Sequence, residues 1–172
     1  MSTRCNIVIK SGQSTVYMYR HCDGYLAETG ADLLAKIEAA NGVADKFLRS
    51  LFSEYYEQQS YEKQPRRVYE LTTELHGDIE HCYTIEFKDD FVTGKVSIRH
   101  AERPKSWGDD NLETGDWAWM GKRHTTDSLR DAVNTERKAS NARLAKLAQE
   151  NPHYKQYEPY PMLEAPEVAL AA

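Results

Sequence analysis

The sequence predicts a small α+β protein with an antiparallel sheet of about five strands, two helices packed on the sheet and a C-terminal surface helix. Three observations lead to this fold class: two β-branched segments around an N-terminal glycine turn, one strongly amphipathic helical segment, and three later segments in which apolar and polar residues alternate. The 172 residues fit one domain, which can bury enough surface to fold without disulfides or metal.

The first elements are a hairpin and a helix. Residues 5–20 read as two strands around the turn Ser11–Ser14, in which glycine supplies the turn conformation. Thr29 then has the position of a helix N-cap with Asp32 in the first turn, and Asn41–Gly42 has the composition that ends a helix.

The middle of the chain combines a helix with three strands. Apolar residues recur at helical spacing over residues 43–56, which predicts the clearest amphipathic helix. Alternation over residues 67–75, 80–87 and 94–100 predicts a three-stranded antiparallel meander. With the hairpin, these segments make up an α+β core.

The chain divides into four parts on this interpretation. The α+β core covers residues 1–101, and an irregular loop that contains all three tryptophans covers residues 102–124. A helix rich in Ala, Leu, Lys, Arg and Glu is expected over residues 125–150. The Tyr- and Pro-rich segment 151–172 is expected to be a flexible tail unless other residues tie it down.

Composition limits the function classes. The net charge of −5, with acidic and basic residues intermixed, argues against a general nucleic-acid binder. Three cysteines without a CxxC pair, and an N-terminus without a long apolar run, predict a protein of the reducing cytoplasm that does not enter the membrane. The sequence holds no P-loop, GxGxxG, HExxH or GxSxG motif. The adjacent pairs His21-Cys22 and His81-Cys82 would point to opposite faces of a strand, so we expect neither cofactor nor metal.

Polar chemistry concentrates after the second strand. His21 and Asp23 could form an acid–base pair, because a carboxylate can hold an imidazole in one tautomer, and Arg20 could lie near a phosphate. The alternative is an Asp-Gly turn with a structural histidine beside it. A second pair depends on strand register: if Phe87 faces Gly94, then His81 faces His100. This second pair would be either a site or a polar rim of the core.

The loop with the tryptophans is the other candidate for function. Trp107, Trp117 and Trp119, together with Tyr25, are the predicted binding residues, because aromatic side chains are enriched where proteins contact other proteins. The alternative is that the loop folds back and its tryptophans cap the core.

The N-terminal region resembles a group of small uncharacterised proteins of bacteriophages and other mobile elements. The resemblance rests on STRCNI at residues 2–7 and on YRHCDGY at residues 19–25, where Leu26 replaces the proline usual in the group. It implies a phage-encoded protein of the host cytoplasm. On that basis we expect an accessory protein that binds a host or defence macromolecule, most simply a host protein, and that could act as its inhibitor. The alternatives are a nucleotide or phosphoester hydrolase that uses His21 and Asp23, and a virion structural component.

Overall fold

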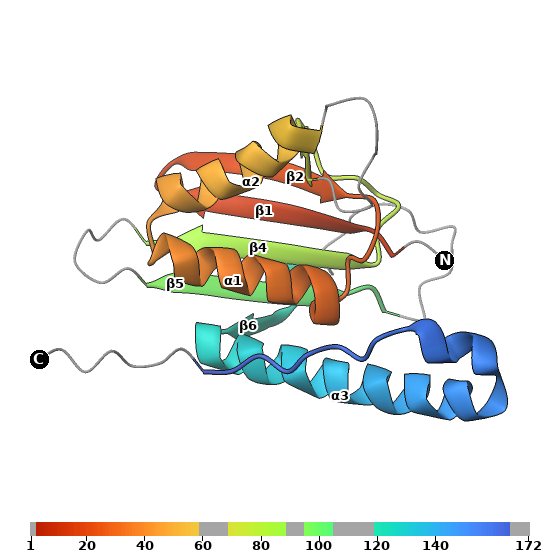
Figure 1. The fold of residues 1–172 in the computed structure, drawn as a ribbon. Helices are drawn as coiled ribbons and strands as arrows, with labels where there is room; N and C mark the ends of the chain where they lie inside the picture. Colours follow the sequence, from red (N-terminus) through yellow and green to blue (C-terminus); the bar gives the residue numbers. More distant parts are fainter. Residues whose placement is uncertain (1–2, 59–68, 89–94, 105–118, 166–172) are drawn as a thin grey trace, which may run out of the picture.

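The fold is α+β, as the sequence predicts. The computed structural model describes residues 3–58, 69–88, 95–104 and 119–165. Within these ranges, three α-helices lie with a six-stranded sheet of order β3-β2-β1-β4-β5-β6 (Figure 1). The elements are β1 (Cys5–Ser11), β2 (Ser14–Arg20), a π-helical turn (Leu26–Gly30), α1 (Ala31–Ala40), α2 (Ala44–Gln58), β3 (Tyr69–Thr72), β4 (His81–Phe87), β5 (Val96–Glu102), β6 (Lys122–His124), α3 (Thr126–Glu150) and a 3-10 turn (Pro152–Gln156).

Local signals in the first quarter of the chain are confirmed at the hairpin and at the end of α1. β1 and β2 pair antiparallel up to Ser11 and Ser14, and Gly12 takes a φ of 55° in the turn between them. Asn41 ends α1 in the left-handed conformation, with a φ of 50°, and Gly42 follows it at 73°.

The start of α1 differs from the prediction that Thr29 is its N-cap. The π-helical turn leads directly into α1, so residue 30 at the cap position already has helical backbone angles. Thr29 is buried, and its hydroxyl donates to the carbonyl of Asp23 at 2.7 Å. The prediction is therefore wrong, because Thr29 bonds back to the preceding corner and no side chain caps α1.

The sheet is mixed, which corrects the predicted meander of three antiparallel strands. β4 and β5 pair antiparallel as predicted, but β4 also pairs parallel with β1 at the centre of the sheet. β3 lies far from β4 in the sheet and pairs antiparallel with β2, with Tyr69 opposite Arg20. Alternation identifies a strand but not its neighbour, which is why the sequence alone gave the wrong partner.

A sixth strand lies inside the segment predicted to be irregular. β6 is three residues long and pairs with β5, with His124 opposite Ile98. β5 itself extends to Glu102, one residue beyond the predicted core boundary. Three residues are too few to show alternation, and the pairing with β5 defines the strand.

Each sheet face has its own apolar cluster. The larger one lies between the sheet and the helices, and α1 and α2 cross the same face of the sheet (Figure 1). It includes Ile7, Tyr83 and Ile98 from the sheet and Phe47 from α2. The smaller cluster lies on the opposite face and consists of Val8, Tyr19, Ile79, Cys82 and Ala101, with Trp119 packed against it.

α3 spans Thr126–Glu150, close to the predicted range, and packs through its N-terminal half. Its buried apolar residues are Leu129 and Val133. The segment that follows α3 runs back along the helix (Figure 1). Two asparagines of α3 hold the segment there by hydrogen bonds to the backbone of the segment. Asn134 pairs with the N–H and C=O of Leu163 at 2.8 and 2.9 Å, and Asn141 does the same with Tyr160 at 2.7 and 2.9 Å. The sequence predicts a flexible tail over residues 151–172 unless other residues tie it down. The asparagines of α3 do tie it down at Tyr160 and Leu163.

The β4–β5 register places the two conditional histidines in contact, although not directly opposite each other. Phe87 faces Val96 rather than Gly94, so His100 faces Tyr83 and His81 faces Glu102. The register prediction is wrong by two residues, which keeps both histidines on the same face. Nδ1 of His81 lies 3.0 Å from Nε2 of His100, a distance at which one ring donates to the other.

We predict an acid-dependent loss of stability from this histidine pair. Burial lowers the pKa of His81 from 6.5 to about 4, and burial with nearby histidines lowers that of His100 to about 3. The unfolded chain therefore binds more protons than the folded one below pH 6.5. The stabilisation is complete above that pH and is lost as the pH falls towards 4, by roughly 1.4 kcal/mol per pH unit for each of the two histidines.

Urea unfolding at a series of pH values measures this effect. Between pH 6.5 and 4.5, the free energy of unfolding should fall less in the double variant His81→Gln, His100→Gln than in the wild type. His153→Gln, which changes an exposed histidine, is the matched control and should keep it. Equal declines in the wild type and the double variant would show that the pair is not protonated on unfolding.

Candidate functional site

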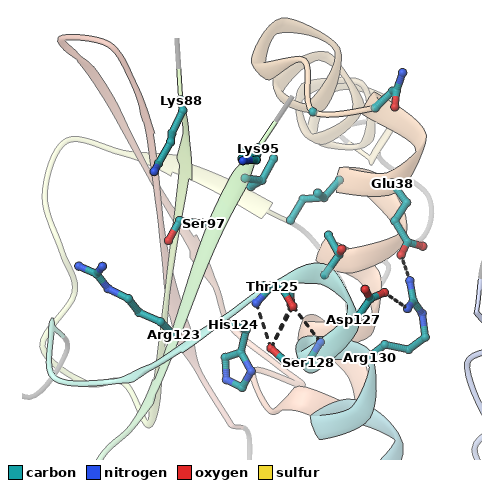
Figure 2. A pocket seen from close by; sticks show the side chains of 15 residues that line it. Glu38, Lys88, Lys95, Ser97, Arg123, His124, Thr125, Asp127, Ser128 and Arg130 are labelled. Carbon is teal, nitrogen blue, oxygen red and sulfur yellow. Dashed lines mark hydrogen bonds and ion pairs between the residues drawn. The ribbon is translucent and has the colours of Figure 1, made fainter. Parts of the chain in front are cut away.

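A large cleft lies at the outer edge of β5, where the chain passes from β6 into α3. β6 pairs only with residues 98–100 of β5, so β6 does not cover the edge at residues 95–97. The cleft has a volume of about 890 Å³ and is bounded by this edge, by the end of α1 and by the start of α3 (Figure 2). Its floor includes the apolar side chains of Ile37 and Val96.

Three cationic side chains line the sheet side of the cleft. Lys88 follows β4, Lys95 precedes β5, and Arg123 comes from β6. The side chain of Arg123 points away from α3 (Figure 2) and also lines a pocket with Arg99 and Trp119. The backbone N–H of Lys88 donates to the carbonyl of Lys95 at 3.3 Å, which holds the two lysines at the same end of the β4–β5 hairpin. Within the described residues none of the three cations makes an ion pair. Their positive charge is therefore not neutralised by carboxylates of the described chain.

The helix side of the cleft carries one cation and two carboxylates, which pair with one another. Arg130 forms ion pairs with Glu38 and with Asp127, the latter at 2.7 Å (Figure 2). Burial acts to lower the pKa of Arg130, but its hydrogen bonds to Asp127 and Glu38 outweigh this and raise the pKa. With Arg130 and the three cations of the sheet side, the lining holds four cations against the two carboxylates of Glu38 and Asp127, so its net charge is +2.

Hydroxyl groups at the start of α3 also line the cleft. Thr125 and Ser128 make a capping box, in which Thr125 N–H donates to Ser128 Oγ at 2.9 Å and Ser128 N–H donates to Thr125 Oγ1 at 3.2 Å. Burial lowers the pKa of the adjacent His124, a shift opposed by a hydrogen bond to the backbone of Ser128, so its ring is neutral at pH 7. The helix therefore presents its positive dipole end and hydroxyl groups beside the lysines.

Arg20, the predicted phosphate contact, is part of the core. It is 1% exposed, and its Nε donates to the Cys22 carbonyl at 3.0 Å. Its Nη1 donates to the hydroxyl of Tyr69 at 3.1 Å, and that hydroxyl bonds in turn to Asp32. The guanidinium thus connects β2, β3 and α1 and stabilises the fold.

His21 and Asp23, the predicted acid–base pair, each contact a tyrosine. Nδ1 of His21 lies 3.3 Å from the hydroxyl of Tyr19, and the hydroxyl of Tyr25 donates to Oδ1 of Asp23 at 3.5 Å. Asp23 has a φ of 58°, which fits the alternative interpretation of this segment as an Asp-Gly corner. An acid–base role for the two residues stays a prediction.

The predicted aromatic binding residues lie in three different environments. Trp119 packs on the smaller apolar cluster, with Lys10 Nζ 5.2 Å from its ring centroid, and its carbonyl accepts a hydrogen bond from Arg99. Trp107 and Trp117 lie outside the described residues. Tyr25 bonds to the hydroxyl of Tyr160 at 3.0 Å and lines a separate, smaller cavity.

Sequence reasoning missed the cleft residues, because no motif marks them. The available signal was a pair of lysines, Lys88 at the start of a predicted connection and Lys95 near the start of the strand that follows it. Their relation to Thr125 depends on β6, which is too short to be predicted.

Metal ligands and membrane spans give no further candidates. The described side chains include no cluster of three or more His, Cys, Asp or Glu placed to hold a metal ion. In the same part of the chain, no helix combines the length and the apolar character that a bilayer crossing requires.

Comparison with known proteins gives no match for this chain. No family model matches the sequence, and neither the comparison with curated proteins nor that with solved structures yields a similar protein. The candidate site therefore rests on its own geometry.

We predict that the Asp-Gly corner tolerates a substitution of Asp23 but not one of Gly24. A Cβ on Gly24 would lie 2.8 Å from the carbonyl carbon of Arg4 and 2.9 Å from Cβ of Cys5, so Gly24→Ala should lower the free energy of unfolding by about 1–3 kcal/mol. Asp23→Gly should change it by less than roughly 0.5 kcal/mol, because relief of the positive φ offsets the greater unfolded-state entropy of glycine.

Urea unfolding of both variants tests the corner. If Gly24→Ala were neutral and Asp23→Gly strongly destabilising, the Asp23 side chain rather than the close backbone approach would hold the corner together.

Proposed function

We propose that the protein binds a small phosphate-bearing ligand, about the size of a nucleotide, in the cleft between β5 and the start of α3. The observation that carries this proposal is that Lys88, Lys95 and Arg123 line the same cleft as the N-terminus of α3. Cationic side chains, backbone amides and hydroxyl groups are the donors that phosphate oxygens prefer.

Charge supports an anionic ligand. None of the three cations makes an ion pair within the described chain, so a phosphate group can bind to them without displacing a carboxylate of that part of the chain. Glu38 and Asp127, the acidic residues of the cleft, both bond to Arg130 and are thereby partly neutralised. A charge-assisted hydrogen bond to phosphate typically contributes about 1.5–3 kcal/mol.

The start of α3 adds donors to these charges. The capping box uses the amide of Ser128, and the amide of Leu129 bonds to the Thr125 carbonyl at 2.9 Å. The amides of Thr126 and Asp127 are therefore the donors that the helix start can offer to a ligand. With 25 residues, α3 is long enough to have a full dipole at this end.

The size of the cleft and the charge of the whole chain favour a small ligand over a nucleic acid. A volume of about 890 Å³ lies in the range of sites that enclose cofactor-sized molecules. The chain as a whole is acidic, with a net charge of −5, so a long polyanion that extends beyond the cleft would meet repulsion. Val96, which is half-buried in the floor of the cleft, supplies apolar surface for the part of the ligand without phosphate.

The earlier hypotheses relate to this proposal in different ways. A hydrolase of nucleotides or phosphoesters would share the ligand class, but the cleft assigns binding to Lys88 and Lys95 rather than to His21 and Asp23. Binding to a host macromolecule through the tryptophans stays a prediction, as do a role in the virion and a location in the cytoplasm.

We predict that the protein binds ADP and inorganic pyrophosphate but not adenosine, as measured by isothermal titration calorimetry. Lys95→Ala and Lys88→Ala should each weaken ADP binding by roughly 10-fold or more, because each removes a charge-assisted contact. Binding should also weaken as salt increases.

Lys146→Ala is the matched control. Lys146 lies on α3 with 78% of its side chain exposed, and its substitution removes the same charge without changing the cleft. Equal weakening by Lys146→Ala and Lys95→Ala would mean that only the overall charge matters. Equal affinity for adenosine and ADP would refute a phosphate site.

A further inference from the structure

A second cavity, chemically unlike the cleft, lies between the sheet and the middle of α3. It has a volume of about 320 Å³ and includes Tyr25, His81, His100, Glu102, Glu136 and Ser140 in its lining. Glu136 is ten residues beyond the start of α3, which places it about 15 Å along the helix from the cleft. Glu136 and Ser140 are one turn apart, so both face the sheet.

The histidine pair forms one wall of this cavity, with its rings end to end. The ring centroids are 5.3 Å apart and the ring planes differ by 15°, whereas Nδ1 of His81 and Nε2 of His100 are 3.0 Å apart. The centroid separation exceeds the nitrogen separation by about the width of one ring, as expected for nearly coplanar rings joined by an N–H···N bond. The outer nitrogens are then Nε2 of His81 and Nδ1 of His100.

A neutral pair with this bond always presents one donor and one acceptor at its outer nitrogens. If His81 donates in the N–H···N bond, its outer nitrogen has a lone pair and the outer nitrogen of His100 carries a hydrogen, and the reverse holds if His100 donates. Burial keeps both rings neutral at pH 7, because it lowers the pKa of His81 to about 4 and that of His100 to about 3.

The outer nitrogens are open to the cavity. His81 is 8% exposed and His100 is 9% exposed, so both rings are more than nine-tenths buried. Among the described residues, the one imidazole nitrogen that is fully buried without a partner is Nδ1 of His124. The outer nitrogens of the pair, which make no hydrogen bond with the described chain, therefore meet the open space that both residues line.

Two carboxylates also line the cavity. Glu102 is the direct partner of His81 in the β4–β5 register, and Glu136 reaches the cavity from α3. Burial and the neighbouring charge of Glu102 raise the pKa of Glu136, against the effect of its hydrogen bonds with the backbone of Ala27 and Leu26. The lining contains no Lys or Arg, so negative charge here has no cation beside it.

We propose that this cavity binds a small organic cation with several N–H donors, of the alkylguanidinium or alkylamine class. The acceptors are two carboxylates, a histidine lone pair and the hydroxyls of Tyr25 and Ser140. They are too dispersed for a metal ion, since the described residues form no metal-binding cluster. A planar cation spreads its donors over a wider frame and can reach several of them at once.

The histidine pair gives the site a specific response to such a cation. N–H donors of the ligand stabilise the tautomer whose lone pair faces them, and the shared N–H···N bond then fixes the tautomer of the second ring. A bound cation should therefore convert an exchanging pair of tautomers into one, which the ¹⁵N chemical shifts of the two rings report directly.

Titration with butylguanidinium, followed by NMR of ¹⁵N-histidine-labelled protein, tests the proposal. N-butylurea serves as the neutral probe of nearly the same shape. We expect saturable binding of butylguanidinium that shifts the His81 and His100 nitrogens, and binding of N-butylurea that is at least about tenfold weaker. Glu102→Gln should weaken butylguanidinium binding by about tenfold or more.

Glu86→Gln is the matched control, because Glu86 is an exposed residue of β4 that lines a pocket on the opposite face of the sheet. It should leave butylguanidinium binding unchanged. The proposal is overturned by equal binding of the two probes, by equal effects of the two variants, by unchanged histidine nitrogen shifts at saturation, or by the absence of saturable binding up to about 10 mM. Because the wild type supplies the nitrogen shifts, an unstable variant does not remove the test.

Discussion

The parallel pairing of β1 with β4 is the constraint on which the rest of the structure depends. It joins two antiparallel hairpins into one sheet, and the buried side chain of Asn6 fixes its position. The amide of Asn6 donates to the His76 carbonyl at 2.9 Å and accepts from the His76 N–H at 3.2 Å, while Arg4 N–H donates to Glu80 at 2.6 Å. These bonds hold the chain that enters β4, so they also place His81 beside α3.

The parts of the fold that could be predicted are those whose signals are local. The hairpin turn at Gly12, the end of α1 at Asn41 and the range of α3 each depend on neighbouring residues and were predicted. Strand partners depend on contacts far apart in sequence: Tyr69 pairs with Arg20 across 49 residues, and alternation carries no information about that choice. The same limit explains the shift of two residues in the β4–β5 register.

The candidate sites could be predicted less well than the fold, because polar residues that look catalytic in sequence are used to build the corner after β2. Arg20 lies in the core, and the hydroxyl of Tyr83 donates to the Gly24 carbonyl at 2.8 Å, which ties the corner to β4. No sequence motif marks the cleft lysines, because their place beside the start of α3 depends on the position of α3 relative to β5. A correct sheet order would have been needed to find them.

α3 contributes residues to two candidate sites of opposite charge, and its attachment to the rest of the chain fixes where these residues lie. Arg137 donates to the Ala27 carbonyl at 2.9 Å and to the Pro161 carbonyl at 2.6 Å, so one side chain fixes the helix to the corner and to the returning tail. A helix held on both sides keeps its N-terminus towards the cationic cleft and Glu136 towards the histidine pair. Preorganised charges lose little free energy to rearrangement on binding, so the sign of the charge would distinguish the ligands that we propose for the two sites.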